Sequence, residues 1–266
     1  MAVILYALML ALGLLASFLS GLLGIGGAII NYPLMLYMPH TLGVATFSAQ
    51  EVSSISMFQV FFASLAGILA YRKKKNSESS LIHKGLVTYM GSSILLGSLI
   101  GGAGSKYLSS NTINMIYGIL AIVAVVLMLL PKKDKKAAVN DVIQFNKWIT
   151  VLSAFVVGIA SGIVGAGGAF ILIPIMLNIL NIPIRTTIAS SLAIVLISAV
   201  GGVIGKVTAG HILVMPTLFV SIGSLIGAPL GAKISSKINP KILRYSLIIL
   251  IVATAIKIWS TVLNGI

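Results

Sequence analysis

The chain has 266 residues, of which 58% are hydrophobic and 8% are charged, and its mean hydropathy is +1.12. Because soluble domains of this size carry about 25% charged residues, the composition excludes a water-soluble globular protein and indicates an integral membrane protein. The formal net charge of +14 gathers in short connections between apolar stretches, which favours a topological role over nucleic-acid binding. The chain has no cysteine, which excludes a disulfide framework and a thiolate metal site.

Apolar stretches near the spanning length of about 20 residues recur along the chain. They run approximately over 2–23, 44–71, 85–105, 111–131, 148–165, 186–205, 212–232 and 242–263, with two shorter ones at 28–38 and 169–180. None alternates apolar and polar residues as the strands of a membrane barrel do. The sequence therefore predicts an all-α, polytopic membrane protein. We interpret the first stretch as part of the mature protein, because it lacks a basic leader and a cleavage site.

The chain contains an internal repeat. Residues 20–36 and 161–177 are identical at ten of seventeen positions, at a constant offset of 141. The same offset pairs Thr46 with Thr187, and the pentapeptide GSLIG occurs at 97–101 and at 223–227. We therefore expect a first transmembrane repeat at 1–131, a basic cytoplasmic linker at 132–147 and a second repeat at 148–266, with about five helical segments in each repeat.

The basic connections indicate that the two repeats are inverted. Connections 72–84 and 131–147 are strongly basic, and such connections are expected on the cytoplasmic side. The second-half equivalent of 72–84 has only Lys206 and His211, whereas 233–241 has three lysines. The basic bias has therefore changed sides, as it does in the inverted repeats of many secondary transporters. This topology puts both termini outside and Lys206 and His211 at an outer interface. It leaves open whether the first hairpin of each half spans fully or re-enters.

The glycine clusters predict a break inside the membrane. Lipid tolerates non-helical backbone only where protein or a cavity satisfies its polar groups. Short helices that begin near Ala28 and Ala169 would expose amide N–H groups and positive dipole ends. With inverted halves, the hairpin tips would meet near the midplane and form an anion site. For residues 97–104 and 201–205, close helix packing through small residues is the preferred interpretation, and Pro33 and Pro174 are expected to kink the short helices.

The candidate substrate-binding residues come from both halves, with hydroxyl groups supplementing the glycine amides. Thr46, Gln50 and Ser53 have the spacing of one helix face. The complete set is Ser20, Gly24, Gly26, Gly27, Ala28, Thr46, Gln50, Ser161, Gly165, Gly167, Gly168, Ala169, Thr187 and Ser190.

Glu51 is the one carboxylate expected inside the membrane, about 10 Å deep at 1.5 Å per residue. It is a candidate for carrying a coupling proton, and the alternatives are a water-filled vestibule or a pair with Lys106. No catalytic group is predicted, because His40, His83 and His211 all fall at segment ends and none belongs to a cluster with metal-ligand spacing. The sequence therefore predicts no enzyme, no metal and no cofactor.

The doubled S-G-x-x-G-x-G-G motif, followed each time by a proline, resembles the TauE/SafE family of sulfite exporters and related sulfur-compound permeases. The resemblance covers nearly the whole chain and implies transport of a small sulfur anion such as sulfite, a sulfonate or sulfoacetate. We expect a secondary transporter that exports this anion by alternating access, with the two halves rocking about the central site. It also implies that the glycine turns line that site. An anion channel with the same site is the alternative function. The expected setting is a bacterial plasma membrane, with a small anion and the lipid bilayer as partners, no nucleic acid, and a homodimer as a further expectation.

Overall fold

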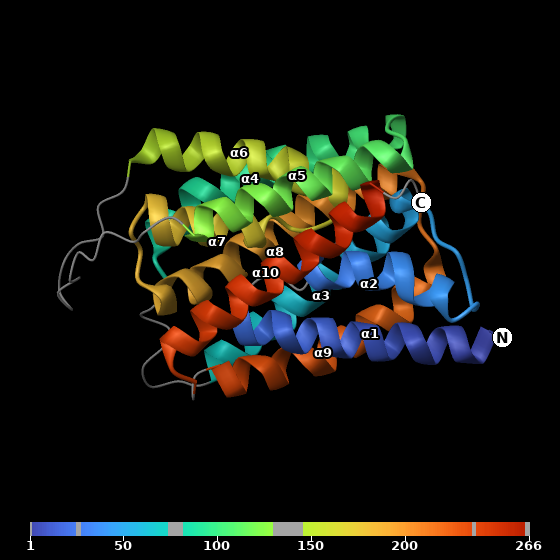
Figure 1. The fold of residues 1–266 in the computed structure, drawn as a ribbon. Coiled ribbons are helices and arrows are strands. Elements are labelled where there is room, and N and C mark those ends of the chain that lie inside the picture. Colours follow the sequence, from blue (N-terminus) through green and yellow to red (C-terminus); the bar gives the residue numbers. More distant parts are fainter. Residues whose placement is uncertain (1, 25–27, 74–81, 130–145, 236–237, 264–266) are drawn as a thin grey trace.

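A computed structural model describes residues 2–24, 28–73, 82–129, 146–235 and 238–263. The first half contains α1 (Ala2–Leu23), α2 (Ala28–Thr41), α3 (Ala49–Lys73), α4 (Lys84–Gly104), the 3₁₀ turn η2 (Ser105–Tyr107) and α5 (Ser110–Leu129). The second half contains α6 (Lys147–Val164), α7 (Ala169–Pro174), the π-helical turn η3 (Ile175–Ile179), α8 (Ile184–Ala209), α9 (Val214–Ser235) and α10 (Pro240–Leu263). The helices form one elongated bundle, and the N-terminus lies at the end where α2 also ends (Figure 1).

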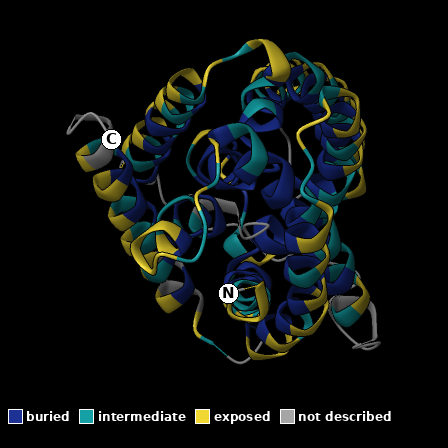
Figure 2. Cartoon of the chain, turned by 90° about the vertical axis from the view of Figure 1, so that its right-hand side faces the viewer, coloured by how far each residue is buried: buried dark blue, intermediate teal, exposed yellow. Residues whose placement is uncertain are grey.

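The predicted all-α membrane fold is confirmed. Within the described ranges, seven helices are long and apolar enough to cross a membrane. Large apolar side chains such as Val126, Leu152 and Ile249 are exposed on the outside of the bundle, where lipid would cover them. Of the seven long helices, α3 and α8 are the most buried, and Figure 2 shows buried helices at the centre and exposed positions around the rim.

Local chemistry sets several helix ends. The Asn146 side chain accepts hydrogen bonds from the amides of Trp148 and Ile149 and so caps the start of α6. Nδ1 of His83 accepts the Leu86 amide at the start of α4. In the short segment after α6, the helix changes from α to π geometry directly after Pro174, because proline supplies no amide for the regular ladder.

Glycine lets helices of the two halves approach to backbone contact. Gly13 and Gly21 of α1 lie against Val220 and Ala228 of α9, so the two helices run in the same direction. A methyl group at either glycine would collide with the carbonyl oxygen opposite. The contact between α1 and α9 at these two positions therefore depends on the absence of a side chain.

The same construction joins α4 to α6 and α8. Gly101 of α4 lies against Ile159 of α6, and Gly201 and Gly205 of α8 lie against the Leu95 and Leu99 carbonyls of α4. In each helix pair, the residue numbers of the contacting positions increase in the same direction along both helices. The three helices are therefore parallel. The expected packing role of the glycines in 97–104 and 201–205 is confirmed at these positions.

The central helices α3 and α8 run in opposite directions. Gly202 packs on Met57 near one end of the pair, and Gly67 packs on Leu192 towards the other. Since α3 and α8 occupy the same place in their respective halves, this antiparallel pairing is what inverted repeats require. The full inversion of the two halves stays a prediction.

The offset of 141 does not extend beyond the glycine motif. Helix α3 begins at Ala49 and α8 begins at Ile184, so a shorter connection precedes α8. Thr46 consequently lies in the segment before α3, whereas Thr187 lies in the first turn of α8. The predicted equivalence of these two threonines is wrong, and so is the common helix face of Thr46, Gln50 and Ser53.

The α4–α6 contact gives a matched pair of alanine substitutions. Gly101→Ala should lower the free energy of unfolding by about 1–3 kcal/mol through overpacking, because its methyl group meets the Ile159 carbonyl. Gly104→Ala should be neutral or slightly stabilising, because nothing lies within 4 Å of its position. Thermal unfolding in detergent checks both, and equal melting temperatures would contradict the packing assignment.

Candidate functional site: a glycine turn beside a buried lysine

The second glycine cluster breaks the chain between α6 and α7. Gly165, Gly167 and Gly168 have φ angles of +79°, +64° and +79°, a region that side-chain-bearing residues rarely adopt. The Ser161 carbonyl accepts hydrogen bonds from the amides of Gly165 (2.8 Å) and Ala166 (2.9 Å). These bonds cap the C-terminal end of α6. The predicted break is therefore present, and glycine is required to form it.

This turn lies inside the protein rather than against lipid. Every residue from Val164 to Leu177 is buried. A methyl group at Gly165 would collide with the Ser53 carbonyl oxygen, and one at Gly167 would lie 2.6 Å from Val60 Cγ1 and 3.2 Å from Val195 Cγ1. Val60 and Val195 lie near the midpoints of α3 and α8, so the turn reaches the middle of the bundle.

Two further predicted residues complete this turn. A methyl group at Gly168 would lie 3.2 Å from the Ser161 hydroxyl oxygen, and that hydroxyl donates to the Gly158 carbonyl (3.1 Å). Ala169, fully buried, begins α7. The structure thus brings Ser161, Gly165, Gly167, Gly168 and Ala169 together.

A buried lysine lies beside the turn. Lys206, near the end of α8, has 1% of its surface exposed. Its Nζ donates to Ser53 Oγ (2.6 Å), Ser105 Oγ (2.8 Å) and the Ile163 carbonyl (2.7 Å). Ile163 belongs to the last turn of α6, where carbonyl groups lack helical partners and a cation is favoured.

The expected interfacial position of Lys206 is therefore wrong. A lysine three residues from a helix end normally extends to the interface, but here η2 and the end of α6 cover it. Its three hydrogen-bond partners are neutral oxygens, so none of them supplies a negative charge to pair with the amine. The sequence offered one signal for this site, a lysine directly after a glycine-rich stretch of α8.

Gly24, the described member of the first glycine cluster, lies at the other end of the central pair. Gly24 has φ +74°, and its amide donates to the Ser20 carbonyl (2.7 Å). It packs against Ile188 of α8, and Ser191 Oγ donates to its carbonyl (2.8 Å). Gly26 and Gly27 lie outside the described residues, and Ala28 begins α2.

The two turns contact equivalent positions on opposite helices. Gly24 meets the fifth residue of α8, Ile188, and Gly165 meets the fifth residue of α3, Ser53. Because α3 and α8 are antiparallel and Ser53 contacts Lys206, the 18 positions from 188 to 206 place Gly24 and Gly165 about 27 Å apart along the bundle. These first glycines do not meet. Whether the tips meet near the midplane depends on Gly26 and Gly27, and that part stays a prediction.

The other predicted residues lie near the ends of the bundle, and three of the four make side-chain contacts there. Thr46 is exposed. Gln50 Nε2 donates to the Leu108 carbonyl (2.8 Å), and its Oε1 accepts from Ser110 (2.7 Å), so it joins α3 to the start of α5. At the start of α8, Ser190 accepts the His83 amide (3.1 Å) and Thr187 Oγ1 lies 3.5 Å from the Ile182 carbonyl. None of these four residues reaches the Gly165–Gly168 turn.

Glu51 lies in the first turn of α3 rather than deep in a helix. Its Oε2 accepts the Ser48 amide (2.8 Å) and the Ser48 hydroxyl (2.9 Å), while Ser48 Oγ accepts the Glu51 amide (3.3 Å). This reciprocal arrangement is a capping box. The expected depth was wrong because the apolar stretch begins before the helix does. A proton-coupling role for Glu51 stays a prediction.

Several buried polar atoms lack a hydrogen-bond partner, although such groups are normally paired. Gln59 of α3 uses its amide nitrogen to donate to Ser17 of α1 (2.6 Å), but its Oε1 is unpaired. Both amide atoms of Asn31 in α2 are also unpaired and fully buried. The remaining unpaired hydroxyl groups in the long helices are those of Ser20, Ser56 and Ser198. These buried atoms of α1, α2, α3 and α8 are therefore available for hydrogen bonds to water or to a polar solute.

Membrane-length helices that enclose a broken backbone, a buried lysine and unpaired polar groups are typical of a multi-pass protein of the transporter class. Residues 9–258 match the sulfite exporter TauE/SafE family, and the chain belongs to this family.

The curated relatives carry transporter names. The probable membrane transporter protein YunE of Bacillus subtilis is 26% identical over 78% of this chain and 80% of its own length. A probable membrane transporter protein of Methanocaldococcus jannaschii is 26% identical over 77% of this chain and 74% of its own length. No solved structure matches the chain.

Removing the buried ammonium should destabilise the protein. Lys206→Met leaves the Ile163 carbonyl and two serine hydroxyls without their donor, so we expect a loss of about 1–3 kcal/mol in the free energy of unfolding. Lys84→Met, at an exposed position in the first turn of α4, is the control and should be neutral. Thermal unfolding of the purified proteins measures both, and a neutral Lys206→Met would refute the assigned contacts.

Proposed function

We propose that this protein is a secondary transporter that moves a small anion by alternating access, with the Gly165–Gly168 turn and the Lys206 charge as part of the binding site. Membership of the family and the names of the relatives support membrane transport. The anion preference is carried by Lys206, whose buried amine donates to neutral oxygens beside the buried, non-helical Gly165–Gly168 turn. We propose that this amine is protonated when the solute binds.

The charge of Lys206 favours an anion even without direct contact. At an effective dielectric constant of about 20, two opposite unit charges 8 Å apart still attract by about 2 kcal/mol. Its hydrogen bonds hold the ammonium in place, so little energy is lost in reorganisation when the solute binds. Glycine contributes by allowing the positive φ angles of Gly167 and Gly168, which turn the backbone inside the protein.

For the solute we propose a small sulfur oxyanion, such as sulfite, a sulfonate or sulfoacetate, moved outward. The family description supports this choice. Backbone amides and serine hydroxyls suit the several acceptor oxygens of such an anion. Thermal-shift measurements with sulfite, thiosulfate, sulfoacetate, taurine and chloride identify the anion, and the proposal fails if none of them stabilises the protein.

We further propose that the protein lies in a bacterial plasma membrane with both termini outside. The support is the position of the helix ends. The C-terminal end of α9 and the N-terminal end of α6, which adjoin basic connections, lie at the end of the bundle away from the N-terminus (Figure 1). Basic connections are retained in the cytoplasm. Labelling of single cysteines introduced at exposed loop positions tests this orientation.

Gly167→Ala should reduce flux of the stabilising anion from proteoliposomes by tenfold or more. The added methyl group would lie 2.6 Å from Val60 Cγ1 and must shift the turn, and a displacement of about 1 Å in a functional site can cost on the order of 100-fold. Gly43→Ala is the matched control. Gly43 has the same φ of +64° but has nothing within 4 Å, so its flux should stay near that of the unmodified protein.

Counterflow separates a transporter from a channel that uses the same site. Unlabelled anion inside the vesicles should accelerate the uptake of labelled anion, because an alternating site carries solute in both directions. Flux that rises linearly with concentration and shows no counterflow would favour the channel. In the alanine experiment, equal flux in Gly167→Ala and Gly43→Ala would contradict a role of the glycine turn in the site.

Proton coupling through Glu51 has its own test. Glutamine also completes a capping box, so Glu51→Gln removes the titratable group while keeping the cap of α3. If Glu51 carries the coupling proton, an imposed pH gradient should drive flux in the unmodified protein and should lose its effect in Glu51→Gln. A gradient that drives both proteins equally assigns coupling elsewhere, and one that drives neither indicates uncoupled transport.

A further inference from the structure

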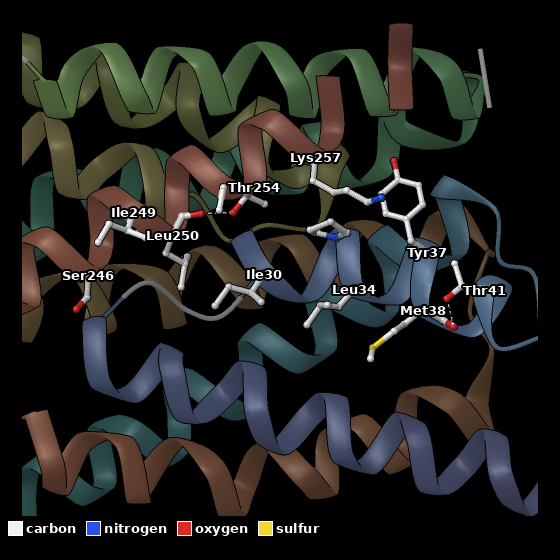
Figure 3. Close-up of a pocket in the computed structure, with 12 residues that line it drawn as sticks. Ile30, Leu34, Tyr37, Met38, Thr41, Ser246, Ile249, Leu250, Thr254 and Lys257 are labelled. Atoms are coloured by element: carbon white, nitrogen blue, oxygen red, sulfur yellow. Dashed lines mark hydrogen bonds between the residues drawn. The ribbon is translucent and has the colours of Figure 1, made fainter. Parts of the chain in front are cut away.

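A groove separates α2 from α10 on the outside of the bundle. It has a volume of about 640 Å³ and is lined by one stripe of each helix (Figure 3). Ile30, Leu34 and Leu250 form part of its apolar wall. At its edge, Met38 is 41% exposed and Ile249 is 69% exposed. The groove therefore opens sideways to the surface that faces lipid rather than to the central turn.

The groove is apolar along its length and cationic at one end. Nζ of Lys257 lies 5.2 Å from the centre of the Tyr37 ring, and Figure 3 shows the two side chains meeting at the end of the groove. Thr41, the last residue of α2, lies at the same end. Because α2 ends at Thr41, we assign this end of the groove to the membrane–water interface.

The length of the groove matches one leaflet. From Ile30 to Thr41 the lining follows eleven residue steps of α2, which is about 17 Å at 1.5 Å per residue. Half of a hydrocarbon core of about 30 Å is about 15 Å. An acyl chain that begins at the Lys257 end would therefore lie along the whole groove and end near the middle of the membrane.

We propose that the groove between α2 and α10 binds one anionic phospholipid, with an acyl chain between the two helices and its phosphate beside Lys257. Apolar walls select a hydrocarbon chain over a free anion, and the cationic end selects a negative headgroup over a zwitterionic one. The proposal does not depend on which solute the protein transports.

The test measures lipid binding to the purified, delipidated full chain. Dioleoylphosphatidylglycerol and dioleoylphosphatidylcholine are titrated separately, and bound lipid is counted by native mass spectrometry with thermal stability as a second readout. We expect at least a fivefold preference for phosphatidylglycerol. Lys257→Gln should abolish that preference, and Leu34→Trp, which fills the groove, should reduce binding of both lipids.

Lys106→Gln is the matched control, because Lys106 also lies over a tyrosine ring, that of Tyr107 (4.9 Å), but Lys106 does not line this groove. It should keep the lipid preference. Equal loss in the Lys106 and Lys257 variants would overturn the proposal, and so would equal binding of the two lipids by the unmodified protein. Displacement of the lipid by inorganic phosphate alone would indicate a phosphate site and would also overturn it.

Discussion

The structure depends on one constraint: peptide groups that leave a helix inside a membrane must be enclosed by protein. The turn at Gly165 and Gly167 satisfies this constraint by packing its backbone on the middle and the start of α3, with α8 on the other side. Lys206 completes the enclosure, since its ammonium satisfies a carbonyl at the end of α6 that helical geometry leaves unpaired. The same enclosure places the Lys206 amine beside the turn at which we propose that the solute binds.

Much of the architecture could be predicted from the sequence because membrane helices leave a strong signal. Each apolar stretch corresponds to a helix, and the spacing of the glycine clusters located the breaks after α1 and α6. The packing role of Gly101 was also foreseeable, because small residues at helical spacing serve close packing, but its partner Ile159 was not. The boundary at Ala49 was not, since the apolar stretch that begins near residue 44 continues into α3 without a break in composition.

The site was harder to predict because its polar groups act over long distances in the sequence. Ser53, Ser105 and Ile163 come from three elements, and only the packed bundle shows that Lys206 reaches all of them. Conversely, Gln50 and Glu51 have the composition of site residues, but one joins α3 to α5 and the other caps α3. Sequence patterns identify a polar side chain at a given depth but cannot identify its neighbours.

The glycine contacts also determine which parts of the bundle travel together. Helix α1 of the first half touches α9 of the second backbone to backbone, and α4 of the first half touches α6 and α8 of the second in the same way. Interfaces without intervening side chains resist sliding. A cycle in which one half moved as a rigid body against the other would have to separate these backbone contacts, whereas pairs made of one helix from each half keep them intact.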